Sequence, residues 1–428
     1  MKHNQRIPGE LLRRGARHAA LTLAAALALA ACDSLLDVEA PSRIPAEGLD
    51  DPANASLLLN GAIGDFECAF QSYVVMGGIV GEELVDATQT ADRWPYDRRA
   101  VDPSDRRYGE FACTALGVYT PLSTARWAAE NALAKLQGWT DEQVPNRGVA
   151  IATAAAYSGY SHLLLGEGFC SGVLLDETLT AGGEVPRADV LRRAVARFDQ
   201  AVQGAQAAGN ADVLNMALVG RARAKLNLGD KAGAAADARL VAANYAKTIT
   251  ASTIAARREN RVVEQNNNSQ SVTIGPAYRN LTFGGVADPR VRVTDSGRNA
   301  TDGNRIWVQN KYATLATGIP LATWDEAQLI IAEVEGGQAA VNIINMFHTR
   351  AGIPAFSSTD PAAIQAQVIE ERRRELFLEG HHLGDVIRYN LALTPATGTP
   401  FSKGGTYGST TCLPLPNIEK LNNTNISG

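Results

Sequence analysis

The residues best suited to chemistry stand near the end of the chain, in the run Glu370-Glu371-Arg372-Arg373-Arg374-Glu375. Clustered guanidinium groups are a common means of binding a phosphate or a carboxylate. On a helix, however, consecutive side chains point about 100° apart, so the three arginines cannot all face one ligand. Glutamates at helical spacing are the alternative partners, in the pairs Glu370–Arg374, Glu371–Arg374 and Arg372–Glu375. We therefore expect these arginines to be structural, with Leu376 and Phe377 adding apolar contacts.

Histidines offer little support for a metal site. His381 and His382 follow the arginines, and the only others beyond the first 31 residues are His162 and His348. Adjacent histidines on a helix diverge, so one metal ion is not expected to bind both. No CxxC or paired-histidine spacing accompanies the cysteines either. We expect no catalytic residue, no metal and no cofactor.

A hydrolase remains the rival class of function. Retaining glycosidases need two carboxylates about 5 Å apart. Because the chain has 45 acidic residues, their number alone does not exclude such a pair. Motifs such as G-x-S-x-G and H-E-x-x-H are nevertheless absent from the sequence.

The N-terminus reads as a lipoprotein signal peptide over residues 1–31. Basic residues precede an apolar run from Ala19 to Ala31, which is shorter than the ~20 residues that span a bilayer. Leu29-Ala30-Ala31-Cys32 is a lipobox, and the Cys32 thiol is the group that receives the lipid. Lipid chains would anchor the protein to a membrane. Removing the segment changes the formal net charge from −5 to −9, which argues against nucleic acid as a partner.

Four cysteines remain after Cys32: Cys68, Cys113, Cys170 and Cys412. An even number in an oxidising compartment predicts two disulfides, for which three connectivities are possible.

The middle of the chain predicts helices joined by glycine turns. Segments rich in Ala, Leu and Arg recur with a period near 3.6 and without proline. They cover residues 124–137, 150–165, 190–207, 213–228 and 341–348. Leu226–Ala234, LNLGDKAGA, has the helix–glycine–helix form of a tetratricopeptide repeat, but the spacing between turns is irregular. We expect one mostly α domain over residues 32–428, with a tether at 32–55 and inserted loop regions with short hairpins at about 64–123 and 248–322.

Aromatic residues in the inserted regions are the predicted ligand-binding groups, because a flat ring on a rigid scaffold can stack against a sugar or a peptide side chain. The first choices are Trp94 and Tyr96, with Trp307 second; Tyr108, Tyr278 and Phe283 complete the set. The competing interpretation is that these rings anchor their own loops. Trp127 and Trp324 sit in helical patterns and are expected in the core, and the polar run 265–270 is expected to be a solvated loop.

Several stretches stand in a telling order along nearly the whole chain: the lipobox Cys32–Val38, Leu226–Ala238, Asp288–Val291, Ala327–Asn345 with Thr349–Ile353, Glu370–Tyr389 and Leu413–Glu419. Together they resemble the RagB/SusD family of nutrient-binding outer-membrane lipoproteins. The resemblance implies a mostly α-helical α-α superhelix with tetratricopeptide-like pairs. It also implies a lid-like partner role on a SusC-like TonB-dependent β-barrel transporter. The expected ligand is an oligosaccharide or a peptide. The alternative hypothesis is an assembly scaffold that binds no ligand.

The resemblance also bears on the arginines and the cysteines. It places Arg372, Arg373 and Arg374 in the scaffold rather than in the ligand cleft. It implies that the segment after Cys412 packs back on the scaffold, and Cys170 follows one of the scaffold's repeat helices. Cys68 and Cys113 flank the first inserted region, so the favoured disulfides are Cys68–Cys113 and Cys170–Cys412.

Overall fold

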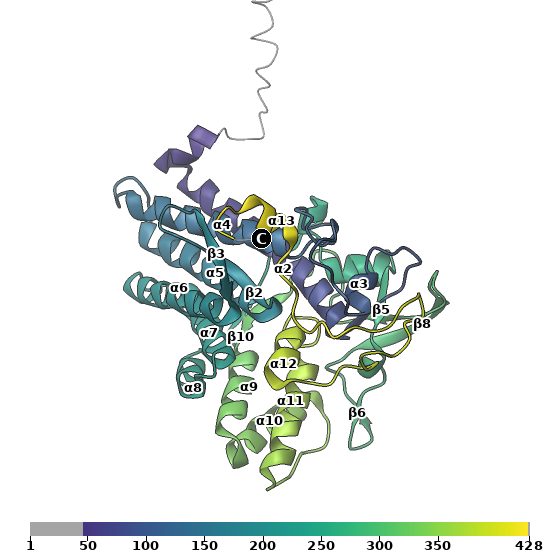
Figure 1. Cartoon of the computed structure of the whole chain (residues 1–428). Coiled ribbons are helices and arrows are strands. Elements are labelled where there is room, and N and C mark those ends of the chain that lie inside the picture. The colour runs from purple at the N-terminus through teal and green to yellow at the C-terminus, as the bar shows by residue number, and fades with distance from the viewer. Residues whose placement is uncertain (1–45, 427–428) are drawn as a thin grey trace, which may run out of the picture. The chain divides into compact units, whose positions relative to one another are not determined.

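The structure is a computed structural model that describes residues 46–426 (Figure 1). Its contacts separate the chain into two compact units, Met1–Asp51 and Pro52–Gly428. The predicted signal peptide, Cys32 and the tether residues 32–45 lie outside the described residues. Of the first unit, residues 46–51 are described, and they include the short 3-10 helix η1, Ala46–Asp50. The elements below belong to the second unit.

Helices dominate this unit, and most of them are longer than the segments predicted from the sequence. Their bounds are α2 Ala55–Val80, α3 Trp94–Asp97, α4 Tyr119–Gly138, α5 Arg147–Gly168, α6 Arg187–Ala207, α7 Ala211–Asn227, α8 Lys231–Arg239, α9 Trp324–Glu335, α10 Gly337–Ala351, α11 Pro361–Glu375, α12 His382–Tyr389 and α13 Asn417–Asn422. The mostly α fold predicted from the sequence is confirmed.

Strands are short and pair only two by two, always antiparallel. Their bounds are β1 Leu84–Asp86, β2 Ser171–Leu175, β3 Ala181–Pro186, β4 Ala246–Thr248, β5 Val272–Ile274, β6 Thr282–Phe283, β7 Val286–Ala287, β8 Val293–Asn299, β9 Arg305–Gln309 and β10 Pro320–Thr323. The pairs are β1–β5, β2–β3, β4–β10, β6–β7 and β8–β9.

Helices α4 to α11 pack in chain order, each against its neighbour, which gives the tetratricopeptide-like array (Figure 1). Small residues permit the close approach: a Cβ atom on Gly220 of α7 would lie 2.3 Å from the ring of Phe198 on α6. The predicted turn after α7 is also present. Gly229 has a φ of +83°, the left-handed conformation that closes a helix, and Asp230 then caps α8 by accepting a hydrogen bond from the Gly233 amide.

The inserted region expected at about 64–123 begins later than predicted. Residues 64–80 belong to α2, and the irregular segment runs from Gly81 to Val118. Every residue from Phe66 to Val80 is buried, because other helices surround this part of α2. A helix without a solvent-exposed face lacks the polar–apolar period on which sequence reasoning depends, and this is why the prediction failed here.

The second inserted region holds the short strands predicted for it, but its polar run is not a solvated loop. Residues Val263–Asn268 form a π-helix, in which Gln265 and Asn266 are buried. The Asn266 amide donates to the carbonyls of Val272 and Trp307, 3.0 Å away in both cases. The asparagines thus satisfy the backbone of β5 and β9, a tertiary role that composition alone does not reveal.

Among residues 46–426, no helix combines the length and the apolar character needed to cross a bilayer.

Candidate functional site

A cavity of about 260 Å³ lies where distant parts of the chain meet, beside the end of α2, strand β1, helix α3 and the segment after β5. A C-terminal segment, residues 394–407, closes one side, and we call it the strap. Figure 1 shows the yellow C-terminal chain running past α3 and β5. The chemically useful lining residues are Glu82, Asp97, Arg99, Asn304, Phe401 and Tyr407.

Arg99 joins the cavity wall to the strap. Its guanidinium donates to Glu82 Oε1 at 2.9 Å and to the carbonyl of Pro395, and it lies 4.8 Å from the centre of the Tyr407 ring. Burial raises the pKa of Glu82 to about 7, although the charge of Arg99 opposes the shift. The cavity therefore holds a carboxyl group that can donate or accept a hydrogen bond near neutral pH.

Asp97 supplies a second carboxyl group on α3. It is 6 % exposed, and burial raises its pKa to about 7. The backbone N–H of Asp86 donates to it, and the charge of Lys403 opposes the rise in its pKa. Its carboxyl group, like that of Glu82, can therefore donate or accept a hydrogen bond near neutral pH.

Lys403 fastens the strap to the rest of the unit. Its ammonium group lies 2.6 Å from Asp86 Oδ2 and 2.8 Å from Asp302 Oδ2, and all three side chains are nearly buried. An ammonium group held by two carboxylates at this depth fixes the strap in place.

The structure separates the three predicted ligand-binding aromatics. Trp94 is half-buried on α3, its ring 6.5 Å from that of Phe401 in the cavity wall. Its indole Nε1 has no hydrogen-bond partner among residues 46–426. Trp307 is half-buried on β9, and the guanidinium of Arg279 lies 5.5 Å from its ring centre.

Tyr96 was predicted to stack on a ligand, and that prediction is wrong. It is 1 % exposed, its hydroxyl donates to the carbonyl of Leu116 at 2.6 Å, and its ring packs edge-on against Tyr108. Tyr108 and Tyr278 are buried in the same way. These rings anchor their own loops, as the competing interpretation had it. Trp127, expected in the core, is instead 47 % exposed on α4.

Sequence reasoning missed Glu82, Arg99, Phe401 and Tyr407. The run Trp94–Arg98 drew attention to α3 and to the polar groups beside its rings, which include Asp97. Nothing in the sequence indicated that the strap, about 300 residues further on, closes the same cavity.

The three arginines are structural, as predicted, but only part of their pairing was foreseen. Arg374 pairs with Glu370 at 3.0 Å, as expected. Arg372 instead holds Asp385 through two hydrogen bonds of 2.9 Å, and Glu371 is taken by Arg290 and His348. Arg372 and Glu371 have partners outside their own helix because their side chains point into the core, where the neighbouring charged residues of that helix do not reach. Leu376 and Phe377 are buried, as expected.

The two adjacent histidines diverge. The His381 ring lies between Glu326 and Arg223 in the core, whereas the ring of His382 packs edge-on against Tyr278. Within the described part of the chain, no group of three or more His, Cys, Asp or Glu side chains is arranged to hold a metal ion.

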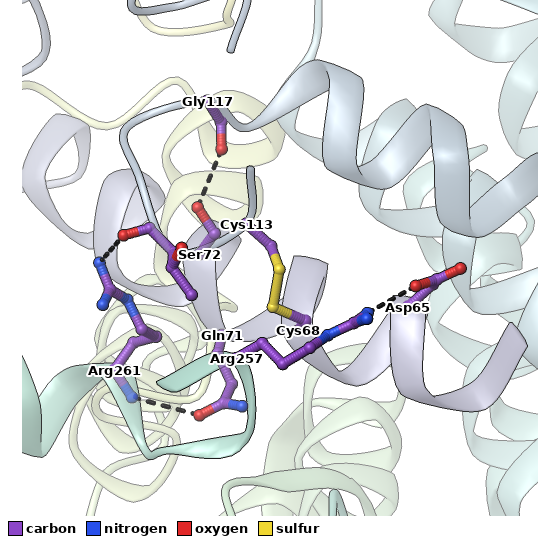
Figure 2. Close-up of a disulfide and its surroundings, with 9 residues drawn as sticks. Asp65, Cys68, Gln71, Ser72, Cys113, Gly117, Arg257 and Arg261 are labelled. Atoms are coloured by element: carbon purple, nitrogen blue, oxygen red, sulfur yellow. Dashed lines mark hydrogen bonds and ion pairs between the residues drawn. A yellow bond between two sulfur atoms is a disulfide. The ribbon is translucent and has the colours of Figure 1, made fainter. Parts of the chain in front are cut away.

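Both disulfides have the favoured connectivity: Cys68 is bonded to Cys113, and Cys170 to Cys412. Figure 2 shows the first, which ties the middle of α2 to the segment before α4.

Known proteins resemble this chain in sequence over one segment and in fold over most of its length. Residues 326–412 match the model of the SusD family. No curated protein matches the chain.

Among solved structures, a SusD-like carbohydrate-binding protein from Bacteroides vulgatus superposes with a TM-score of 0.66 at 16 % identity, covering 88 % of this chain and 97 % of its own. A laminarin-binding SusD-like protein superposes with a TM-score of 0.64 at 15 % identity, covering 88 % of this chain and 98 % of its own. Surface glycan-binding protein A from Bacteroides thetaiotaomicron, in complex with laminarihexaose, superposes with a TM-score of 0.67 at 12 % identity. The match covers 87 % of this chain and 98 % of that protein.

The fold is thus that of SusD-like proteins over nearly the whole length of these structures. The resemblance to the RagB/SusD family predicted from the sequence is confirmed by the family match over α9 to Cys412 and by this fold.

Proposed function

We propose that the protein binds an oligosaccharide in the cavity between α3, β1 and the strap, without cleaving it. The observation that carries the proposal is the makeup of that cavity. The rings of Phe401 and Tyr407 offer apolar faces, and Asp97, Glu82 and Arg99 offer hydrogen-bonding groups. A sugar ring has an apolar face and a rim of hydroxyl groups, and it matches both. Similar folds that bind laminarin or laminarihexaose support the same class of ligand.

Replacing Trp94 by alanine should weaken glycan binding. Trp94 does not itself line the cavity, but its ring packs edge-on against Phe401, which does, so losing the ring should displace that wall. We expect the affinity for the best neutral oligosaccharide of a panel that includes laminarihexaose to fall at least about tenfold, or ~1.4 kcal/mol. Isothermal titration calorimetry measures the change.

Trp139→Ala is the matched control, because Trp139 is also half-buried but lies at the end of α4 among the scaffold helices. Trp307→Ala tests whether the ligand reaches β9. Unchanged affinity in the Trp94 variant, with the melting temperature preserved, would place the glycan outside this cavity.

We further propose that the protein is a lipoprotein of the outer membrane that passes its ligand to a SusC-like TonB-dependent transporter. The lipobox at Cys32 and the SusD-like fold support this assignment. Acylation of Cys32 is the expected result of mass spectrometry on the mature N-terminus. Cys32→Ser should release the protein into the soluble fraction, and membrane association of that variant would contradict the anchor. Co-purification of a β-barrel protein with the wild type tests the transporter.

A glycan hydrolase is the second candidate, because Glu82 and Asp97 line one cavity and both have pKa values raised by burial to about 7. A carboxyl group with a raised pKa is what an acid catalyst of glycoside cleavage needs. Incubation with the same oligosaccharides followed by product analysis separates the two functions: released fragments that disappear in Glu82→Gln would establish the enzyme.

A further inference from the structure

A second feature suited to binding lies on the segment before α4. The ring of Phe111 is 82 % exposed. Burying a phenylalanine side chain is worth roughly 1.5–3 kcal/mol, so a ligand that covers this ring gains that contribution on binding. Flexibility of the segment does not account for the exposure, because the segment is firmly attached.

Three attachments hold this segment against the core, and Figure 2 shows them together. Cys113 is bonded to Cys68 of α2. The carbonyl of Thr114 accepts a hydrogen bond of 2.7 Å from Arg261, and the carbonyl of Gly117 accepts one of 3.0 Å from Ser72. The phenylalanine ring therefore stands on a rigid base, which lowers the entropy lost when a ligand binds.

A hollow of about 300 Å³ opens beside the ring. Its other walls are Pro121 and Thr124 of α4, Asp65 of α2 and Arg257 of η3, Ala256–Arg258. Arg257 Nη2 donates to Asp65 Oδ1 at 2.6 Å (Figure 2), and the two side chains are 50 % and 34 % exposed. No residue of this hollow lines the cavity near Trp94.

The charges of the hollow are balanced. Asp65 and Arg257 form a pair with no net charge, so the hollow favours neither an anion nor a cation. Each nevertheless keeps hydrogen-bonding capacity: a carboxylate accepts at two oxygens, and a guanidinium carries five N–H donors. Of these donors, the contacts within residues 46–426 use one, to Asp65.

We propose that this hollow is a second binding site, for a single neutral sugar ring, with Phe111 stacking on its apolar face and the Asp65–Arg257 pair bonded to adjacent hydroxyl groups. A purely apolar ligand would leave the ion pair poorly solvated, whereas a hydroxyl can donate to Asp65 and a neighbouring one can accept from Arg257. The Thr124 hydroxyl offers a further polar contact. This site does not depend on the cavity near Trp94, and each can exist without the other.

Saturation-transfer NMR on the soluble protein, residues 32–428 with Cys32→Ser, tests the site. The probes are the methyl glycosides of glucose, galactose, mannose, xylose and N-acetylglucosamine, each at millimolar concentration. For at least one of them, Phe111→Ala should raise the Kd obtained from the concentration dependence of the signal about tenfold, corresponding to ~1.4 kcal/mol. Asp65→Ala should reduce the same signal, and Trp94→Ala should leave it in place.

Two controls distinguish stacking from loss of structure. Phe111→Tyr keeps the flat ring and should keep the signal. Leu240→Ala removes another exposed apolar side chain, at the end of α8, and should change nothing. The proposal is overturned if no sugar of the panel gives a signal that depends on Phe111. It is also overturned if Phe111→Ala affects only the association with another protein, since the ring would then be a protein contact.

Discussion

Arg372→Ala is expected to lower the free energy of unfolding by up to about 3–5 kcal/mol, because it removes the first of the two arginines that compensate a buried carboxylate. Arg372 and Asp385 are 4 % and 6 % exposed and share two hydrogen bonds of 2.9 Å. Burial raises the pKa of Asp385, but the charges of Arg372 and Arg388 bring it down to about 2. The carboxylate is therefore ionised in the folded protein, and removing Arg372 leaves only the hydrogen bond of 2.8 Å from Arg388 to compensate its charge among residues 46–426.

Chemical denaturation followed by circular dichroism measures the loss. Arg350→Ala is the matched control, since its pairs with Asp325 and Glu375 involve a side chain that is 48 % exposed, and exposed pairs contribute roughly 0–1 kcal/mol. Glycan affinity should be kept in both variants, because neither arginine lines the cavity. Equal denaturation midpoints for Arg372→Ala and wild type would show that the pair is not a structural element.

Loss of the Cys170–Cys412 disulfide is expected to lower the free energy of unfolding by as much as Arg372→Ala does. The two residues are 242 apart in the sequence, and closing a loop of this length restricts the unfolded chain by up to about 5 kcal/mol in the chain-entropy model. The bond also joins two hydrogen-bonded segments, since Leu413 donates to the carbonyl of Gly168 at 2.8 Å and accepts from the Cys170 amide at 3.0 Å.

Melting of the Cys170→Ala/Cys412→Ala double variant, compared with Cys68→Ala/Cys113→Ala, tests this expectation. The second pair encloses only 45 residues and should cost less, about 4 kcal/mol. A non-reducing peptide map of the wild type checks the connectivity itself. Free thiols, or a larger loss from the shorter loop, would contradict the expectation.

The scaffold of this protein could be predicted from its sequence because its information is local. Amphipathic periodicity and the turn at Gly229 each act over a few residues, and the predicted helical segments lie within α4, α5, α6, α7 and α10, apart from Leu228 just after the end of α7. Most of helix α2 was missed, since a helix buried on all sides has no polar face to mark its period.

The candidate site was predicted only in part because it depends on long-range contacts. Whether an aromatic residue in a loop is exposed is decided by what packs on it: Tyr96 is 1 % exposed beside Tyr108, whereas Trp94 is half-buried beside Phe401. The partners of the arginines show the same limit. Arg374 pairs with Glu370 one helical turn away, whereas Arg372 pairs with Asp385, which lies beyond the end of its helix.

The strap held by Lys403 has a consequence for finding the ligand. The walls of the cavity come from residues near 82, 97, 304 and 401, which adjoin only in the folded chain. A molecule that fills the cavity therefore binds the native state and not the unfolded one. By mass action it stabilises the native state by RT ln(1 + [L]/Kd), about 2.7 kcal/mol at a concentration of one hundred times Kd. A melting-temperature screen of soluble glycans thus reports occupancy directly, and Lys403→Met, which frees the strap, should abolish the shift for ligands of this cavity alone.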